Sequence, residues 1–301
     1  MHTEVTWGLL IVVYLFTAGV SAGAMVASNA AFLLGGDRYE RVARWGAYLA
    51  PFPIAFGTGV LLLDLGSPLN FFRLFMTLQY KSPMSWGSWA ILLFTLLSLV
   101  YLYLWLPPRY QIGHVIKRVR VWQGGLAKGM PILAVSVASY TGVLLNAADR
   151  PLWQIALLPE LFLVSAMSTG VAAVGVAVAL SRRWRANHEE KRSLALVDIV
   201  LVGIELLIFG AMMIDSQIGT LNQQLAYAVL WTGSYAATFW IMIMLLGLVV
   251  PLILKIVEVR GRLSWKWTER VGLGSSLLVL VGGFFVRYVI TYAGQMTGWL
   301  R

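Results

Sequence analysis

Two tyrosines and one aspartate are the side chains of this chain whose types and positions best suit redox chemistry in a membrane. Tyr14 lies within the first long apolar stretch, Asp64 ends the second, and Tyr140 lies near the end of the fourth, shortly before Asn146. Phenols donate hydrogen bonds of the kind that the two carbonyls of a quinone need, and a carboxylate takes or gives the proton that accompanies each electron. We therefore predict a quinone site with Tyr14, Asp64, Tyr140 and Asn146, at which Asp64 transfers protons.

Each of these residues also has a simpler interpretation. Tyrosines commonly anchor helices at the membrane interface, and Asp64 would be a helix-end carboxylate in headgroup water. Tyr14 is about 10 Å below the outer end of its stretch, and Asp64 and Tyr140 are expected at a similar depth. Their coincidence favours a site over three separate anchors.

The apolar part of the sequence lacks the usual ligands of metal centres. The sequence has no cysteine, and its three histidines, His2, His114 and His188, lie outside the apolar stretches. Haem, copper and iron–sulfur clusters are held mainly by Cys and His. We expect no metal site, no haem and no iron–sulfur cluster in this chain.

Three acids of the sixth stretch form a second candidate set. Asp198 and Glu205 are seven residues apart and share one helix face, and Asp215 lies about 15 Å further along. An acid inside a membrane costs roughly 2.5–3.5 kcal/mol and suggests a function, here a proton path through Asp198, Glu205 and Asp215. The alternative is that Asp198 and Asp215 are interfacial and only Glu205 is buried, beside a hydroxyl. Arg287 is expected near the outer boundary, where it snorkels or pairs with Asp215.

The elements that must position these residues are membrane-spanning helices. Of the 301 residues, 59% are hydrophobic and 12% are charged, whereas about a quarter of the residues of a soluble domain are charged. No alternating strand pattern competes with helices. We predict an all-α integral membrane protein with eight transmembrane helices, at about 7–34, 45–65, 86–106, 126–145, 153–180, 194–218, 227–254 and 271–293.

The distribution of basic residues predicts the orientation. Of the 23 Lys and Arg residues, 18 fall in the segments 35–44, 107–128, 181–193 and 255–270. Because basic loops stay in the cytoplasm, both termini are predicted outside, on the periplasmic side. The same distribution explains the net charge of +10 without a nucleic acid as partner.

A weak internal repeat divides the sequence. Gly19 and Gly23 of the first stretch correspond to Ser165 and Thr169 of the fifth, at an offset of 146 residues. An offset of four helices preserves their orientation, so the halves would be related by an axis along the membrane normal. We predict two four-helix bundles, a quinone-binding bundle at 1–150 and a second at 151–301.

Short motifs in a constant order carry a family resemblance. They are Tyr14-Leu15-Phe16-x-x-Gly19-x-x-x-Gly23, Leu63-Asp64-Leu65-Gly66-Ser67-Pro68, Ser82-Pro83-Met84-Ser85-Trp86-Gly87-Ser88-Trp89, Tyr140-Thr141-Gly142, Arg150-Pro151-Leu152-Trp153, Gly282-Gly283-Phe284-x-x-Arg287-Tyr288 and Tyr292-Ala293-Gly294. Over essentially its whole length the sequence resembles the NrfD/PsrC family, the membrane subunits of molybdopterin and related respiratory oxidoreductases.

The resemblance implies an eight-helix subunit of a bacterial or archaeal cytoplasmic membrane. It would exchange electrons between menaquinone or ubiquinone and an external, ferredoxin-like iron–sulfur subunit, and a catalytic molybdopterin subunit would lie beyond that. The resemblance also implies that Tyr140 contacts quinone and that Asp64 falls near an acidic residue of the family's site. At the position of Tyr14 the polysulfide-reductase type carries a histidine. The protein would not be a complete enzyme by itself, and proton translocation is left open.

A secondary transporter built from parallel repeats is the alternative from a different class. Transporter helices are typically broken near the middle of the membrane, whereas the Gly and Pro interruptions here, such as Gly66-Ser67-Pro68, lie at the ends of stretches. A passive anchor is a third possibility, and the combination of Tyr14, Asp64 and Tyr140 argues against it.

Overall fold

The structure is a computed structural model, and it describes residues 7–64, 83–110, 119–148, 150–181, 187–261 and 264–298. These residues form helices and connecting turns, without β-strands. The helices are α1 (Leu9–Gly35), η1 (Gly36–Tyr39), α2 (Glu40–Leu49), α3 (Pro51–Asp64), α5 (Pro83–Trp105), η3 (Pro108–Tyr110), α6 (Val119–Asn146), α7 (Leu158–Leu180), α8 (His188–Ile218), α9 (Leu221–Trp231), α10 (Ala236–Thr238), the π-helical η5 (Phe239–Val249), α11 (Val250–Val259) and α12 (Trp265–Met296).

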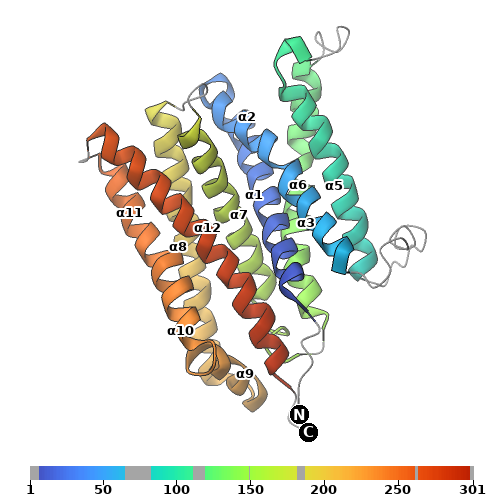
Figure 1. Ribbon diagram of the computed structural model, residues 1–301, viewed down its shortest axis with the longest axis vertical. Helices are drawn as coiled ribbons and strands as arrows, with labels where there is room; N and C mark the ends of the chain where they lie inside the picture. The colour runs from blue at the N-terminus through green and yellow to red at the C-terminus, as the bar shows by residue number, and fades with distance from the viewer. Residues whose placement is uncertain are drawn as a thin grey trace.

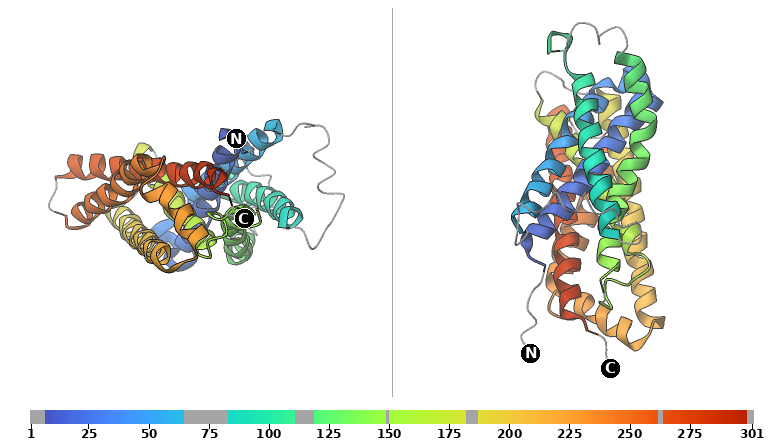
Figure 2. Two further views of the ribbon diagram at one scale, coloured as in Figure 1. Left: turned by 90° about the horizontal axis from the view of Figure 1, so that it is seen from below. Right: turned by 90° about the vertical axis from the view of Figure 1, so that its right-hand side faces the viewer.

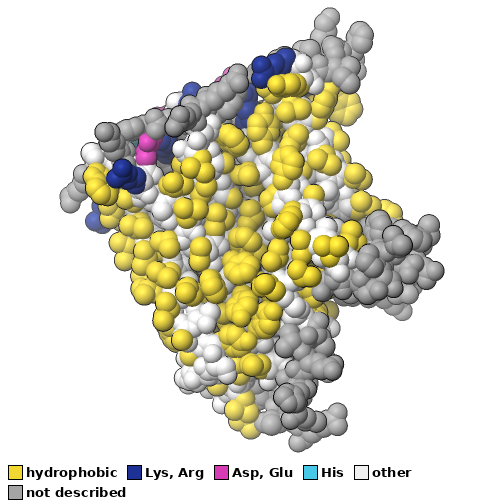
Figure 3. Space-filling model, viewed as in Figure 1, with side chains coloured by type: hydrophobic (Ala, Val, Ile, Leu, Met, Phe, Trp, Pro, Cys, Tyr) yellow, Lys and Arg dark blue, Asp and Glu magenta, His cyan; other side chains and the backbone are white. Residues whose placement is uncertain are grey.

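Seven helical segments of the described residues are long and apolar enough to cross a membrane. The last six overlap the third to eighth apolar stretches predicted from the sequence, but the predicted stretch 227–254 is wrong at its start, because the chain turns at 232–235 between α9 and α10. The first, Leu9–Leu63, is 55 residues long and covers most of both earlier stretches. It is not one straight rod, because the chain turns at η1 and α2 and α3 pack back along α1 (Figure 1). Hydrophobic side chains cover the visible flank of the molecule, and Lys and Arg gather at the end that carries η1 (Figure 3).

The segment 35–44 was predicted as a basic loop between the first two stretches. In the structure it is helical instead, and it forms η1 and the start of α2. Gly36 has a φ of 54°, a left-handed conformation that glycine adopts readily, and it reverses the chain. Hydroxyl groups of α1 then bind the returning helix, since Ser28 donates to the carbonyl of Ala43 and Ser21 to that of Ala50. The next helix starts at Pro51, which has no N–H with which to continue α2.

The helices α1 and α7 cross at the centre of the molecule. A Cβ atom on Gly23 would overlap the carbonyl group of Ala166, and one on Gly170 would overlap the backbone of Gly23. Small residues of this kind let two helix backbones touch in a membrane. Helices α2, α3, α5 and α6 lie on the α1 side of this contact, and α8, α11 and α12 lie on the α7 side (Figure 1). The two sides are therefore joined through α1 and α7.

Residues from both ends of the described part of the protein are bonded to each other. The backbone N–H of Trp7 donates to Oε1 of Gln295 at 2.9 Å, and Nε2 of Gln295 donates to the Trp7 carbonyl at 3.1 Å. The indole of Trp7 also packs on that of Trp153, with ring centroids 4.9 Å apart. The first and last described residues consequently lie at the same end of the bundle (Figure 2), opposite the basic end.

Candidate functional site

Tyr14 and Tyr140 lie close together between the helices of the first half. Tyr14 is 2% exposed and lies on α1 where that helix meets α3, since a Cβ on Gly57 would contact the Tyr14 backbone. The ring of Tyr140, on α6, rests so closely on Gly87 of α5 that a Cβ there would overlap it. The two phenol groups are near enough to interact electrostatically. Four helices thus bring together two of the residues predicted for a quinone site.

Asp64 and Asn146, the other two residues, lie at helix ends. Asp64 is the last residue of α3, and its side chain lies outside the described residues. Because Gly57 is level with Tyr14, Asp64 lies about 10 Å nearer the end that carries the termini rather than at the same depth. Asn146 ends α6, and its amide nitrogen donates to the carbonyl of Ile155 at 3.4 Å. In this structure Asn146 therefore ties down the connection between α6 and α7.

The acids of α8 lie on its buried face. Buried residues recur along α8 at intervals of mostly three and four and include Glu190, Asp198 and Glu205. Asp198 is 0% exposed and Glu205 is 3% exposed. The alternative in which Glu205 is the one buried acid of the three is therefore wrong. Glu190 has a local structural role, because its carboxylate accepts a hydrogen bond from the backbone of Asn187 at 2.7 Å and caps the helix.

Asp198 forms an ion pair inside the second half. Its Oδ2 lies 2.8 Å from Nζ of Lys255 on α11, and its Oδ1 accepts a hydrogen bond from Ser168 of α7 at 3.3 Å. Lys255, itself 4% exposed, also donates to Ser276 of α12 at 3.2 Å. Four helices thus contribute to the pair. Neither charge would be tolerable in this position without the other.

Sequence reasoning missed Lys255, which it counted among the basic residues of the segment 255–270. The residue lies within α11, and its neighbours Leu254 and Ile256 are apolar. A lysine inside an apolar run, rather than after its end, indicates a buried charge, and this signal was available from the sequence. Its acidic partner could not be identified from sequence, because α8 and α11 meet only in the folded protein.

A second buried charge, Arg287 of α12, lies beside Glu205, further from the basic end than the Lys255–Asp198 pair. Arg287 is 0% exposed. Its Nη1 donates to Oγ of Ser165 at 2.7 Å and to the carbonyl of Gly283 at 2.8 Å. The same Ser165 hydroxyl is bonded to the Glu205 carboxylate, which also interacts electrostatically with Arg287. A serine of α7 therefore joins an acid of α8 to a base of α12.

The expected positions of Arg287 and Asp215 are corrected by these contacts. Arg287 does not snorkel or pair with Asp215, because it is enclosed beside Glu205. The carboxylate of Asp215 instead accepts a hydrogen bond from the Tyr227 hydroxyl at 2.8 Å. Between Glu205 and Asp215 the buried face of α8 carries the apolar Phe209 and Met212. The three predicted acids are consequently not one continuous polar row.

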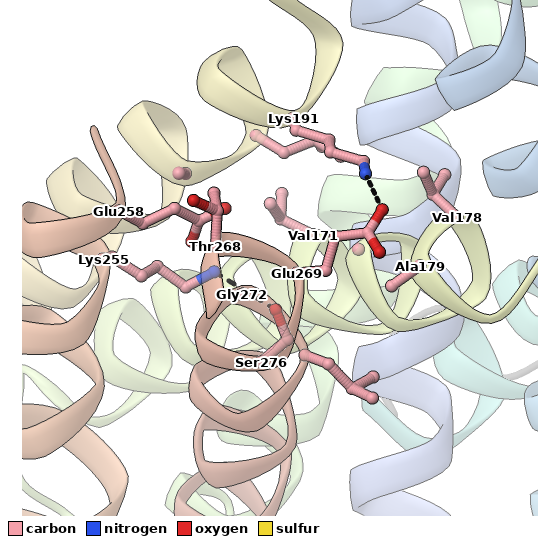
Figure 4. A pocket seen from close by; sticks show the side chains of 14 residues that line it. Val171, Val178, Ala179, Lys191, Lys255, Glu258, Thr268, Glu269, Gly272 and Ser276 are labelled. Carbon is pink, nitrogen blue, oxygen red and sulfur yellow. Dashed lines mark hydrogen bonds and ion pairs between the residues drawn. The ribbon is translucent and has the colours of Figure 1, made fainter. Parts of the chain in front are cut away.

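A small pocket opens at the basic end of the second half. Its polar lining includes Lys191, Lys255, Glu258, Glu269 and Ser276. At about 40 Å³ it has room for water and is too small for a quinone. Lys191 and Glu269 form an ion pair of 3.0 Å across it, and Lys255 and Ser276 lie on its inner side (Figure 4). Within the described part of the protein, no three His, Cys, Asp or Glu side chains are grouped so as to hold a metal ion.

The family model and the relatives that match this sequence agree with one another. The family model described as "Polysulphide reductase, NrfD" matches residues 1–298. A polysulfide reductase subunit of Wolinella succinogenes is 28% identical over 98% of this sequence and 96% of its own length. Protein NrfD of Escherichia coli is 28% identical over 98% and 97%. A more distant relative, the Hdr-like menaquinol oxidoreductase integral membrane subunit of Archaeoglobus fulgidus, is 21% identical over 95% and 71%.

Proposed function

The chain belongs to the polysulphide reductase NrfD family, and from this we propose that it is the quinone-reactive membrane subunit of a respiratory oxidoreductase complex. It exchanges electrons between menaquinone or ubiquinone and an iron–sulfur subunit at the end of the bundle that carries the termini. A catalytic, molybdopterin-containing subunit completes the complex. The names of two relatives support this, since one is part of a polysulfide reductase and another is a subunit of a menaquinol oxidoreductase.

The proximity of Tyr14 to Tyr140, close enough for electrostatic interaction, is the observation that carries the proposal. Both are hydrogen-bond donors on helices of the first half, in largely apolar surroundings. A bound quinone supplies two-electron, two-proton redox chemistry there. Tyr14 and Tyr140 orient its carbonyl oxygens by hydrogen bonds, and Asp64 exchanges protons nearer the end of the bundle. The donor set fits a quinone, because it offers phenols and a carboxylate from separate helices.

The membrane topology follows from the same reasoning. Leu9–Leu63 is proposed to cross the membrane twice, through α1 and through α2 with α3, which gives eight crossings in all. The basic end faces the cytoplasm of a bacterium or archaeon, and both termini lie outside the cytoplasmic membrane. The halves 1–150 and 151–301 are proposed as two related bundles. Support comes from α1 and α7, which carry the repeat-equivalent residues Gly19 and Ser165 and cross each other.

A transporter is the weaker assignment. Helices α1, α7, α8 and α12 are each continuous α-helices of 23 to 32 residues. Transporters of the repeat type use helices broken near the middle of the membrane, where unwound backbone binds ions and substrate. The continuity of these four helices supports the electron-transfer assignment.

The test uses the complex purified with its partner subunits. Tyr140→Phe, Tyr14→Phe and Asp64→Asn are each expected to lower quinone-linked turnover by about tenfold, the effect of one lost hydrogen bond of about 1.4 kcal/mol. Tyr48→Phe is the matched control, because it removes a phenol that donates to the Trp105 carbonyl at 2.9 Å, in a different part of the fold. Extraction and identification of bound quinone accompanies the assay. Wild-type turnover in all three site variants, or a complex without quinone, would contradict the proposal.

A further inference from the structure

We propose that the second half of the protein carries a proton path from the basic end to the quinone site, through the Lys255–Asp198 pair and the Glu205–Ser165–Arg287 group. The path is inferred from buried ionisable side chains and a pocket that the electron-transfer function does not use. Its connection to quinone rests on the proposed function, whereas its opening to the basic end does not.

The pocket at the basic end is the entrance. Glu258 and the Lys191–Glu269 pair form part of its lining, so charges of both signs lie among apolar side chains such as Val171 and Leu194. Lys255 and Ser276 form its inner side and are themselves bonded (Figure 4). Water in this pocket therefore reaches the ammonium group of Lys255, which lies 2.8 Å from Asp198.

Two serines of α7 connect the first acid to the second. Asp198 and Glu205 are separated by about 10 Å along one face of α8, a gap that needs intervening groups. Ser168 bonds to Asp198, and Ser165, three residues earlier on α7, bonds to Glu205. Hydroxyl groups both donate and accept hydrogen bonds, so together with water they pass protons between carboxylates.

The inner end of the path has spare hydrogen-bonding capacity. Oε1 of Glu205 and Nε of Arg287 are buried and have no hydrogen-bond partner among the described protein groups. Buried polar atoms of this kind are costly unless they bind water. The Glu205–Arg287 group therefore suits a hydrated site inside the bundle rather than a dry structural contact.

The path ends beside α1, not at Asp215. The apolar Phe209 and Met212 follow Glu205 on the buried face of α8. In the other direction, a Cβ on Gly19 of α1 would lie 2.9 Å from Nη2 of Arg287. Tyr14 is five residues before Gly19 on the same helix, about 7.5 Å along its axis. The last charged group of the path thus lies next to the helix that carries Tyr14.

This arrangement gives a balanced reaction. Reduction of one quinone takes up two electrons and two protons. The electrons come from the iron–sulfur subunit of the proposed complex, and the protons come along the path from the basic end, so the reaction moves charge across the membrane. Oxidation of quinol releases two electrons to that subunit and two protons along the path in reverse.

The first experiment uses the absence of native cysteine and needs no quinone. Single variants Ser276→Cys and Ser168→Cys are exposed to silver ion, a thiol reagent small enough to follow water, from the basic side of oriented vesicles. Both are expected to react, Ser276→Cys faster. Ser98→Cys, at an equally buried position on α5, is the control and is expected to stay unmodified by mass spectrometry. If Ser168→Cys reacts no faster than Ser98→Cys, the path is overturned.

The second experiment measures proton uptake by the reconstituted complete complex with pH dyes on each side. Glu205→Gln and the double variant Asp198→Asn with Lys255→Met are expected to lower charge movement at least tenfold while bound quinone is retained. The double variant removes both charges of the pair and leaves neither unpaired. If the pair had only a structural role, this variant would therefore keep wild-type activity. Glu160→Gln, an exposed acid on α7, is expected to behave as wild type.

The outcomes separate the two proposals. Wild-type charge movement in both path variants, or proton uptake from the terminus side alone, overturns the path while the quinone function stands. A wild-type complex without quinone turnover overturns the function and with it the coupling. The silver reaction then still decides whether the second half opens to the basic end.

Discussion

Gly23 of α1 and Gly170 of α7 meet backbone against backbone, with no side chain between them. This contact joins the helix that carries Tyr14 to the helix that carries Ser165 and Ser168. It therefore sets the spacing between the proposed quinone site and the buried charges of the second half. A change at this crossing would disturb both.

Gly170→Val is expected to lower the free energy of unfolding by about 1–3 kcal/mol or more, because the added atoms overlap the Gly23 backbone. Gly203→Ala is the matched control, since nothing lies within 4 Å of a Cβ at this position of α8. Alanine there is expected to be neutral or to stabilise by up to about 1 kcal/mol. Thermal unfolding in detergent measures both. Equal melting temperatures for the two variants would show that the crossing is not tightly packed.

Arg287→Met is expected to destabilise the protein by about 3–5 kcal/mol, because it leaves the Glu205 carboxylate buried without its counter-charge. The double variant Arg287→Met with Glu205→Gln removes both charges and is expected to recover most of that loss. Denaturation of the wild type, both single variants and the double variant gives the coupling between the two residues. Additive effects would contradict the pairing.

Arg38 and Glu189 form an ion pair at the basic end, with side chains that are 62% and 57% exposed. An exposed pair is weakened by water and salt, so Arg38→Ala is expected to leave the melting temperature almost unchanged. Lys255→Met should lower it much more, because Lys255 is buried with Asp198. Melting temperatures at low and high salt check the contrast. A strong, salt-sensitive loss in Arg38→Ala would contradict it.

Gln295→Leu is expected to loosen the attachment of Trp7 to α12. The leucine keeps much of the side-chain volume but removes both hydrogen bonds to the Trp7 backbone, each worth about 1 kcal/mol. Hydrogen exchange of the Trp7 amide should become faster, while exchange in α8 should not change. Unaltered exchange at Trp7 would show that its stacking on Trp153 is sufficient.

Much of the helical framework could be predicted from the sequence. Hydrophobic stretches and 3.6-residue periodicity are local properties, so the apolar helices and the shared face of Asp198 and Glu205 were accessible without a structure. The helical prediction and the family resemblance are confirmed. The prediction of a loop at 35–44 was wrong. Its charged residues indicated a loop, whereas contacts with α1 stabilise it as a helix.

By itself the sequence determined that the protein consists of apolar helices with basic segments between some of them. These properties depend on residues that are neighbours in the chain. Only the tertiary structure decided which buried charges neutralise each other. Lys255 meets Asp198, and Arg287 meets Glu205, because α7, α8, α11 and α12 pack against one another. Residues on separate helices carry no local signal of their pairing, since the low dielectric that forces charges together exists only after the helices have assembled.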